Sequence, residues 1–249
     1  MRLDQLVLER GLAATRSQAQ ALLLAGRVRV GIGDGARTDR KPGDMVDVET
    51  PLERTASAAY VSRGGEKLAA ALDAFGLIVD GAICLDVGAS TGGFTDCLLQ
   101  RGASRVYALD VGRGQLAESL RADPRVVSLE RTHARRLDPA DAQAISLPES
   151  VSLAVIDVSF ISVTRILAGV VHQLVPGGTI VCLVKPQFES EPRDVPKGVV
   201  RDPAVQARAV ERVRAAAVGI GLLVSGECES PLRGPSGNRE FFLHLALPA

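Results

Sequence analysis

The chain has 249 residues, enough for one α/β domain and a small additional module, and its 46% hydrophobic content can form a core. Its 29 basic and 29 acidic residues balance, which excludes a uniformly basic nucleic-acid-binding surface and leaves only local patches for RNA. Aromatic residues make up only 3%, so a broad platform for stacking bases is excluded as well.

The four cysteines are scattered and show no C-x-x-C spacing, so we expect buried thiols rather than a metal site or disulfides. No apolar run approaches the ~18 residues of a membrane span, and the first residues do not read as a signal peptide. We therefore expect a cytoplasmic protein that has no membrane partner and binds no metal.

The first fifty residues predict two helices and a small sheet. Apolar residues at helical spacing predict a first helix from Leu3 that ends before Gly11. Thr15 is expected to cap the second helix, with Gln18 as its capping-box partner, and Gly26 to end it. The remaining expected elements are a strand at 27–30, a turn at 41–44 and a strand at 46–48.

This segment resembles the S4 RNA-binding module. The resemblance is carried by Leu3-Asp4, Arg10-Gly11, Thr15-Arg16-Ser17, Gly26-Arg27-Val28-Arg29-Val30 and Lys41-Pro42-Gly43-Asp44. It implies that Arg16, Arg27 and Arg29 contact RNA phosphates. The alternative is a solvated face of a small structural domain, which the nearly even charge of residues 1–54 favours slightly. We assign 1–54 to an S4-like RNA-binding domain.

Residues 50–61 have no apolar period, and we place a linker at 55–61 between the S4-like domain and a second domain at 62–249. Ser62 can cap a helix that carries Leu68 and ends at Gly76. Lys67 lies in the first turns of that helix, where the helix dipole disfavours a cation.

Residues 83–94 read as a strand, a glycine-rich loop and the start of a helix. The loop spacing, Asp86-x-Gly88-x-x-x-Gly92-Gly93, differs from the dinucleotide fingerprint and resembles the first motif of class I S-adenosylmethionine (SAM) methyltransferases. A carboxylate would repel a pyrophosphate but suits the cationic SAM. The alternative is an ordinary tight turn between strand and helix.

A second strand ends in Asp110, where a carboxylate can take ribose hydroxyls. The strand at 126–129 ends next to a segment that is expected to lie near the base of the ligand. The predicted SAM-binding residues are Asp86, Gly88, Ala89, Ser90, Thr91, Gly92, Gly93, Asp110, Val111, Thr132, His133 and Asp157.

Strands and helices then alternate to the end of the chain, with helices expected at 93–100, 116–120 and 205–218. Lys185 ends an apolar strand at 179–185, and a buried ammonium needs a carboxylate partner, for which Asp157 at the end of strand 153–157 is the candidate. The last expected elements are a loop at 187–202 that could cover a substrate, and strands at 222–224 and 241–245.

Four residues, Lys67, Asp157, Lys185 and Glu240, resemble the Lys-Asp-Lys-Glu tetrad of RNA ribose 2′-O-methyltransferases. The strings Ser62-Arg63-Gly64-Gly65, Asp157-Val158-Ser159-Phe160, Lys185-Pro186-Gln187-Phe188-Glu189 and Gly237-Asn238 agree locally. With the S4-like start, nearly the whole chain is similar to the TlyA family, ribosomal RNA 2′-O-methyltransferases that are also labelled hemolysins. Two departures are His133, where the family often has Asn, and Tyr60, where it often has Trp.

The resemblance implies the fold, the cofactor and the partners. The fold would be α/β: a Rossmann-like class I methyltransferase domain, mostly parallel with a terminal antiparallel strand, preceded by a small α+β S4-like domain. The cofactor would be SAM, the partner ribosomal RNA, and the catalytic residues the four of the tetrad. The further RNA contacts would be Arg63, Phe160, Arg193 and Lys197.

The residues leave open whether Lys185 acts as a base or as an electrostatic positioner. They also leave two rival classes: a membrane-active hemolysin and a non-catalytic RNA-binding protein. The family divides by its termini into longer forms that modify both ribosomal subunits and shorter forms that modify the large one. The short ends of this chain lead us to expect 2′-O-methylation of a cytidine in the large subunit.

Overall fold

The computed structural model describes residues 1–54 and 59–249, and the chain forms two compact units, Met1–Arg63 and Gly64–Ala249. Of the linker predicted at 55–61, residues 55–58 lie outside the described residues. The domain boundaries that we placed at 54 and 62 stay a prediction.

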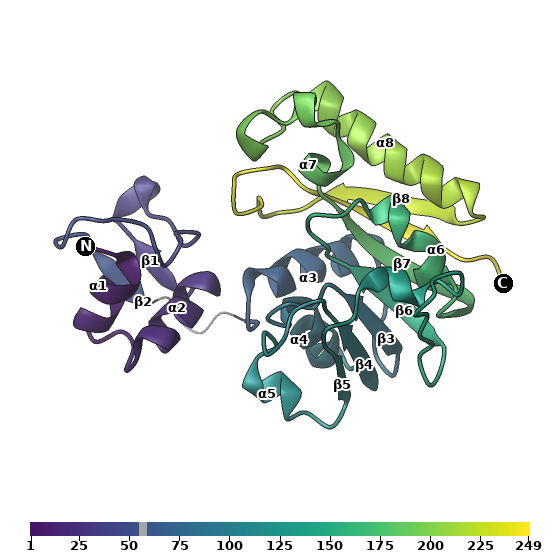
Figure 1. The fold of residues 1–249 in the computed structure, drawn as a ribbon, viewed down its shortest axis with the longest axis horizontal. Helices are drawn as coiled ribbons and strands as arrows, with labels where there is room; N and C mark the ends of the chain where they lie inside the picture. Colours follow the sequence, from purple (N-terminus) through teal and green to yellow (C-terminus); the bar gives the residue numbers. More distant parts are fainter. Residues whose placement is uncertain (55–58) are drawn as a thin grey trace. The chain divides into compact units, whose positions relative to one another are not determined.

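In the smaller unit, helices α1 (Leu3–Glu9) and α2 (Arg16–Leu24) pack together over a core that includes Leu3, Val7 and Leu23 (Figure 1). Thr15 caps α2, its Oγ1 accepting from the Gln18 N–H at 3.2 Å. Gln18 reaches back to the N–H of Ala14 at 2.8 Å, one residue earlier than a capping box requires.

The sheet of this unit pairs β1 (Val28–Val30) with β2 (Leu52–Arg54), antiparallel, with a short 3₁₀ turn η1 (Gly33–Gly35) between them. The strand predicted at 46–48 is wrong. Met45 makes an isolated bridge with Arg2, and the N–H of Val46 donates to the Met1 carbonyl, so this segment follows the N-terminus instead of joining β1.

The larger unit is built on a seven-stranded sheet in the order β5-β4-β3-β6-β7-β9-β8. Its strands are β3 (Ile83–Val87), β4 (Arg105–Leu109), β5 (Val126–Leu129), β6 (Val151–Ile156), β7 (Leu174–Val184), β8 (Leu223–Glu229) and β9 (Phe241–Ala246). All neighbours from β5 to β7 are parallel, and β9 runs antiparallel between β7 and β8. The predicted mostly parallel α/β fold with a terminal antiparallel strand is confirmed.

Helices cover this sheet (Figure 1). They are α3 (Arg63–Phe75), α4 (Gly93–Gln100), α5 (Glu118–Arg121), α6 (Leu167–Val171), α7 (Pro186–Glu189) and α8 (Pro203–Gly219), with 3₁₀ turns η2 (Ala134–Leu137), η3 (Val163–Arg165), η4 (Pro192–Asp194) and η5 (Pro196–Gly198). Helix α4 matches its predicted bounds. The segment 187–202 contains α7, η4 and η5, so our description of it as a loop was wrong; Pro at the first position of each turn favours these short helices.

Candidate active site

The loop after β3 turns tightly at the carboxyl end of the sheet. Gly88 and Gly92 have φ of +93° and +94°, the region that favours glycine. A Cβ on Gly88 would collide with the carbonyl oxygen of Asp157, so the glycine lets two strand ends approach each other. Gly92 then caps α4, which begins at Gly93.

Asp86 is fully buried at the end of β3. Its Oδ2 accepts from Thr95 Oγ1 at 2.7 Å, while its Oδ1 has no hydrogen-bond partner among the described residues. Burial raises the pKa of this carboxyl to about 7, against a smaller opposite effect of the Thr95 hydrogen bond. An orphaned, buried carboxylate oxygen suits a cationic ligand group, and the ammonium of SAM is such a group.

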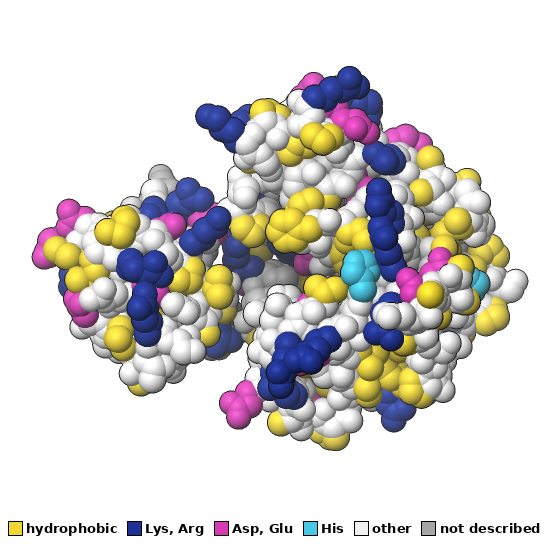
Figure 2. Space-filling view, in the orientation of Figure 1, with side chains coloured by type: hydrophobic (Ala, Val, Ile, Leu, Met, Phe, Trp, Pro, Cys, Tyr) yellow, Lys and Arg dark blue, Asp and Glu magenta, His cyan; other side chains and the backbone are white. Residues whose placement is uncertain are grey.

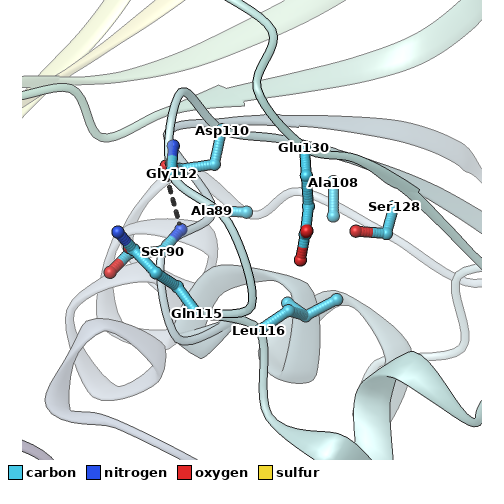
Figure 3. Close-up of a pocket in the computed structure, with 9 residues that line it drawn as sticks. All are labelled: Ala89, Ser90, Ala108, Asp110, Gly112, Gln115, Leu116, Ser128 and Glu130. Atoms are coloured by element: carbon cyan, nitrogen blue, oxygen red, sulfur yellow. Dashed lines mark hydrogen bonds between the residues drawn. The ribbon is translucent and has the colours of Figure 1, made fainter.

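Asp110 follows β4 and holds the glycine-rich loop. One carboxylate oxygen accepts from the Ser90 N–H at 2.9 Å and the other from the Gly112 N–H at 2.6 Å. Figure 3 shows the first of these bonds at the side of a pocket. The pocket is lined by Ala89, Ser90, Ala108, Asp110, Gly112, Gln115, Leu116, Ser128 and Glu130.

Three residues of this lining, Ala89, Ser90 and Asp110, are among the predicted SAM-binding residues. Sequence reasoning missed the others, although one signal was available. Glu130 follows β5 directly, just as Asp110 follows β4, and the carboxyl ends of parallel strands share one edge. A carboxylate at each of two neighbouring strand ends could have identified Glu130.

Other predicted SAM-binding residues lie beside this lining. Val111 is exposed, Thr132 donates through Oγ1 to the Glu130 carbonyl at 3.1 Å, and the ring of His133 is exposed. His133 Nδ1 accepts from the Arg135 N–H at 3.2 Å and so caps η2. Their contact with a cofactor stays a prediction.

The four tetrad residues form two ion pairs. Lys67 Nζ on α3 lies 2.6 Å from Glu240 Oε2, and both side chains are almost completely buried. Lys185 Nζ, directly after β7, lies 2.5 Å from Asp157 Oδ1 and donates to Ser159 Oγ at 3.0 Å. The predicted partner of Lys185 is therefore correct.

The two pairs meet through the sheet. Val184 at the end of β7 is opposite Phe241 at the start of β9, so Lys185 and Glu240 occupy the next positions on neighbouring strands. Gly234 leaves room for Glu240, because a Cβ there would collide with Glu240 Oε1. Sequence reasoning did not single out Gly234, since nothing local distinguishes it from a turn glycine.

Two aromatic rings lie beside this site. The side chain of Phe160 is 92% exposed on a backbone with φ of +66°, and its ring centroid lies 5.3 Å from that of Phe188. Further predicted RNA-binding cations lie on separate elements. Arg193 and Lys197 are exposed on η4 and η5. Arg63 is half-buried at the start of α3. Their contacts with RNA stay a prediction.

In the smaller unit, a buried carboxylate holds part of the predicted RNA-binding surface. Asp4 is fully buried, pairs with Arg2 and Arg16 at 3.0 and 3.1 Å, and has its pKa held well below the usual range by the Arg2 guanidinium. Arg29 lies 3.8 Å from Glu53, and Arg27 donates to the Tyr60 carbonyl at 3.5 Å.

Neither a metal-ligand cluster nor a membrane-spanning helix is present in the described residues. No group of His, Cys, Asp and Glu in residues 1–54 and 59–249 could hold a metal ion. Within the same ranges no helix has the length and apolar character needed to cross a bilayer.

Comparison with known proteins first identifies the class of protein. The order of the seven strands is that of a class I methyltransferase fold, and Asp110 and Glu130 lie at neighbouring strand ends of this sheet. The N-methyltransferase NodS from Bradyrhizobium japonicum shares this fold, with a TM-score of 0.51, 15% identity, and coverage of 75% of this chain and 97% of that one. The model of the FtsJ-like methyltransferase family matches residues 60–247, and that of the S4 domain matches residues 1–31.

Two closer relatives narrow the class. The 16S/23S rRNA (cytidine-2′-O)-methyltransferase TlyA of Mycobacterium tuberculosis is 49% identical over 247 residues, which cover 98% of this chain and 89% of the relative. A Streptococcus thermophilus structure named "Putative hemolysin" has a TM-score of 0.76 and 44% identity, covering 100% of this chain and 88% of that one. The chain belongs to the FtsJ-like methyltransferase family, among its TlyA and hemolysin-like members.

Proposed function

We propose that this protein transfers the methyl group of SAM to the 2′-hydroxyl of a cytidine in ribosomal RNA. The observation that carries the proposal is the placement of the Lys185–Asp157 pair against the glycine-rich loop. The Asp157 carbonyl packs on Gly88, so the ammonium of Lys185 is held beside the loop that would bind the cofactor.

The residues present fit SAM. The unpartnered Asp86 Oδ1 can accept from its ammonium, and the pocket beyond Asp110 offers two carboxylates, Asp110 and Glu130, for ribose hydroxyls. When bound, SAM supplies a methyl group activated by its sulfonium. The protein's own contribution is to place the 2′-hydroxyl in line with that methyl group.

Lys185 is the group that we propose to hold the 2′-oxygen. The Lys185 ammonium has three N–H donors; it donates to Ser159 and forms an ion pair with Asp157. A remaining N–H can donate to the attacking 2′-oxygen and stabilise the negative charge that this oxygen gains as its proton passes to water. Lys67 and Glu240 hold the start of β9 beside this position.

The RNA substrate rests on the S4 domain and on the relative's name. The M. tuberculosis protein is named for 16S and 23S RNA, and of these we propose the large-subunit 23S RNA as the substrate of this chain. A ribosomal substrate would place the enzyme in the cytoplasm.

The test is methyl transfer to purified 30S and 50S subunits that lack the modification, with labelled SAM and ribose mapping of the product. We expect one labelled cytidine 2′-O-methyl group in the 50S subunit and little label in the 30S subunit. Comparable label in both would overturn the subunit preference, and label on a base would overturn the reaction.

The hemolysin name gives the second candidate function, membrane activity. Red cells incubated with the same preparation test it directly. Lysis by a Lys185→Ala variant that no longer methylates RNA would establish a separate membrane activity. If neither the native protein nor this variant lyses the cells, methyl transfer remains the proposed function.

A further inference from the structure

Lys185 makes two contacts of different kinds. Its Nζ lies 2.5 Å from Asp157 Oδ1, yet that oxygen has no hydrogen-bond partner among the described residues, so the ion pair lacks the geometry of a hydrogen bond. The hydrogen bond of Lys185 goes to Ser159 Oγ at 3.0 Å. The attraction between charges has no preferred direction, whereas a hydrogen bond weakens steeply when it is bent. Asp157 therefore holds the charge of the ammonium, and Ser159 sets the direction of one N–H.

The direction of that N–H determines where the other N–H bonds of the ammonium point. They rotate together about the last bond of the side chain, so a hydrogen bond to one of them orients them all. The side chain of Lys185 is only 11% exposed, so water has little access to replace a lost partner. Without the Ser159 hydroxyl, the ammonium would be free to turn an N–H toward the Asp157 carboxylate and away from the 2′-oxygen.

The turn that carries Ser159 is attached to the helix that follows Lys185. Directly after Ser159, Phe160 has φ of +66°, a left-handed conformation that is unfavourable for a side chain of this size. Its ring centroid lies 5.3 Å from that of Phe188 on α7, and Glu189 of the same helix accepts two hydrogen bonds from the residues just beyond Phe160. These contacts stabilise the turn. The donor and the acceptor of the Lys185–Ser159 bond are therefore held by one structural support.

The Ser159 side chain contributes little to the fold itself. Its hydroxyl is exposed and makes no second hydrogen bond to a residue in 1–54 or 59–249. It fills no space in the core, so its removal creates no cavity and leaves no backbone group without a partner. A hydroxyl that contributes little to folding, yet gives the proposed reactive lysine its hydrogen bond, has its role in the reaction.

We propose that Ser159 is a positioning residue for methyl transfer. Its hydroxyl orients the Lys185 ammonium so that a remaining N–H points at the 2′-oxygen, while Asp157 supplies the opposite charge. The proposal rests on the proposed function and adds to the tetrad a residue that takes no proton and forms no bond to the substrate. Ser159 acts only through Lys185, which distinguishes it from an exposed serine that contacts the RNA directly.

The first experiment compares Ser159→Ala and Ser159→Thr with a matched control, Ser152→Ala, in the full-length protein. Ser152 is an exposed serine near the start of β6, and its Oγ donates to the Ile83 carbonyl at 3.3 Å. Methyl-transfer kinetics give kcat and the KM for RNA, calorimetry gives the affinity for SAM, and thermal unfolding gives the midpoint.

The expected result is a loss of kcat alone. Ser159→Ala should lower kcat by about tenfold or more, because a misdirected donor slows the reaction while the binding contacts remain. Its KM, SAM affinity and thermal midpoint should stay native. Ser159→Thr keeps the hydroxyl and should recover most of kcat, and Ser152→Ala should behave as the native protein. A native kcat in Ser159→Ala overturns the proposal, and so does an equal loss in Ser152→Ala. A rise in KM with kcat unchanged would make Ser159 an RNA contact instead.

A double variant tests whether Ser159 acts through Lys185. In a Lys185→Ala protein there is no ammonium to orient, so the addition of Ser159→Ala should lower the single-turnover rate no further. If the two losses multiply in the double variant, the hydroxyl acts independently of Lys185 and the proposal is wrong.

Lysine-selective NMR tests the contact without the reaction. Figure 2 shows Lys and Arg side chains at several places on the larger unit. Only four of the basic residues in the chain are lysines: Lys41, Lys67, Lys185 and Lys197. A nitrogen isotope label on lysine therefore gives few ammonium signals, and the one that Lys185→Ala removes is that of Lys185. Ser159→Ala should shift this signal, whereas Ser152→Ala should not. An unshifted signal in Ser159→Ala overturns the proposal. A shifted signal in a protein that transfers no methyl group contradicts only the proposed reaction.

Discussion

Asp86 is a carboxyl group whose protonation is linked to what binds next to it. Its pKa of about 7 lies above the usual value of a carboxyl group. Between about pH 4 and 7, the folded protein without ligand therefore keeps a proton that the unfolded chain releases. For this reason Asp86 makes folding less favourable as the pH rises through that range. A bound ammonium favours the carboxylate, so SAM binding should release that proton.

The affinity for SAM should therefore rise by up to about tenfold per pH unit below pH 7 and level off above it. Calorimetry from pH 5.5 to 7.5, where the α-amino group of SAM stays largely protonated, measures the affinity in buffers of different ionisation enthalpy and counts the released protons. The Asp86→Asn variant should bind more weakly and lose the pH dependence. A native affinity that is flat over this range would contradict the role of Asp86.

Substitution of Lys185 should lower the rate of methyl transfer without lowering the affinity for SAM. Lys185 directly follows β7, and no described residue that lines the pocket beside Asp110 comes from that strand. Lys185→Ala should lower methyl transfer by at least about 10²- to 10³-fold, the usual cost of losing a donor to a developing oxyanion, with SAM affinity nearly unchanged. Lys185→Arg, which keeps the charge, should retain more activity than Lys185→Ala if Lys185 is a positioner. A loss of SAM affinity as large as that of Asp86→Asn would refute the assignment.

At the scale of elements, Glu189 joins the segment after Asp157 to the segment after Lys185. It ends α7, which follows Lys185, and it accepts from Ser162 Oγ at 2.5 Å and from the Val163 N–H at 2.8 Å in the segment that follows Asp157. Glu189 is 3% exposed, and this burial raises its pKa.

Glu189→Ala leaves the Val163 N–H without this acceptor and should cost about 1–3 kcal/mol of unfolding free energy. It should also lower kcat, because Asp157 and Lys185 lose a common anchor, while SAM affinity stays native. Glu189→Gln can still accept from Val163 and donate to Ser162, so it should recover most of kcat. Denaturant unfolding measures the stability of Glu189→Ala and Glu189→Gln, and steady-state kinetics measures their kcat. Equal kcat values in these two variants would contradict the anchoring role of Glu189.

The sequence predicted these elements unevenly, for physical reasons. Helix α4 and strand β5 matched their predicted bounds because glycines and apolar runs mark both ends locally. The strand expected at 46–48 failed because alternation alone does not select a partner, and β1 pairs with Leu52–Arg54 instead. Strand β7 begins earlier than expected, since Leu174 pairs with Val151 ahead of a register shift that no local pattern reveals.

In the candidate site too, local sequence patterns predicted neighbouring contacts but not distant ones. Strand ends predicted the Lys185–Asp157 pair, because neighbouring parallel strands end side by side. The sequence identified Glu240 as a member of the tetrad, and its partner is Lys67, 173 positions away in the chain. Which lysine a buried carboxylate meets depends on how α3 packs beside the start of β9, and no local sequence pattern indicates that packing.

At the scale of the whole molecule, the two compact units suggest a division of labour. Residues 62–249 alone should fold and bind SAM with native affinity, because the proposed SAM pocket beside Asp110 and both ion pairs lie within them. They should methylate ribosomal RNA poorly, because the S4 domain that is expected to hold the RNA is missing from the fragment. Circular dichroism, SAM calorimetry and methyl transfer on the fragment test this, and full activity would disprove the need for the S4 domain.

The position of β9 in the sheet determines when the sheet can be completed during synthesis. It lies between β7 and β8 in the sheet, yet a ribosome makes it after both, so β8 can join the sheet only when β9 emerges. Until then Lys67 has no Glu240, and β7 presents an open edge that can pair with other chains. We therefore expect products that are truncated before β9 to be inactive and prone to aggregate.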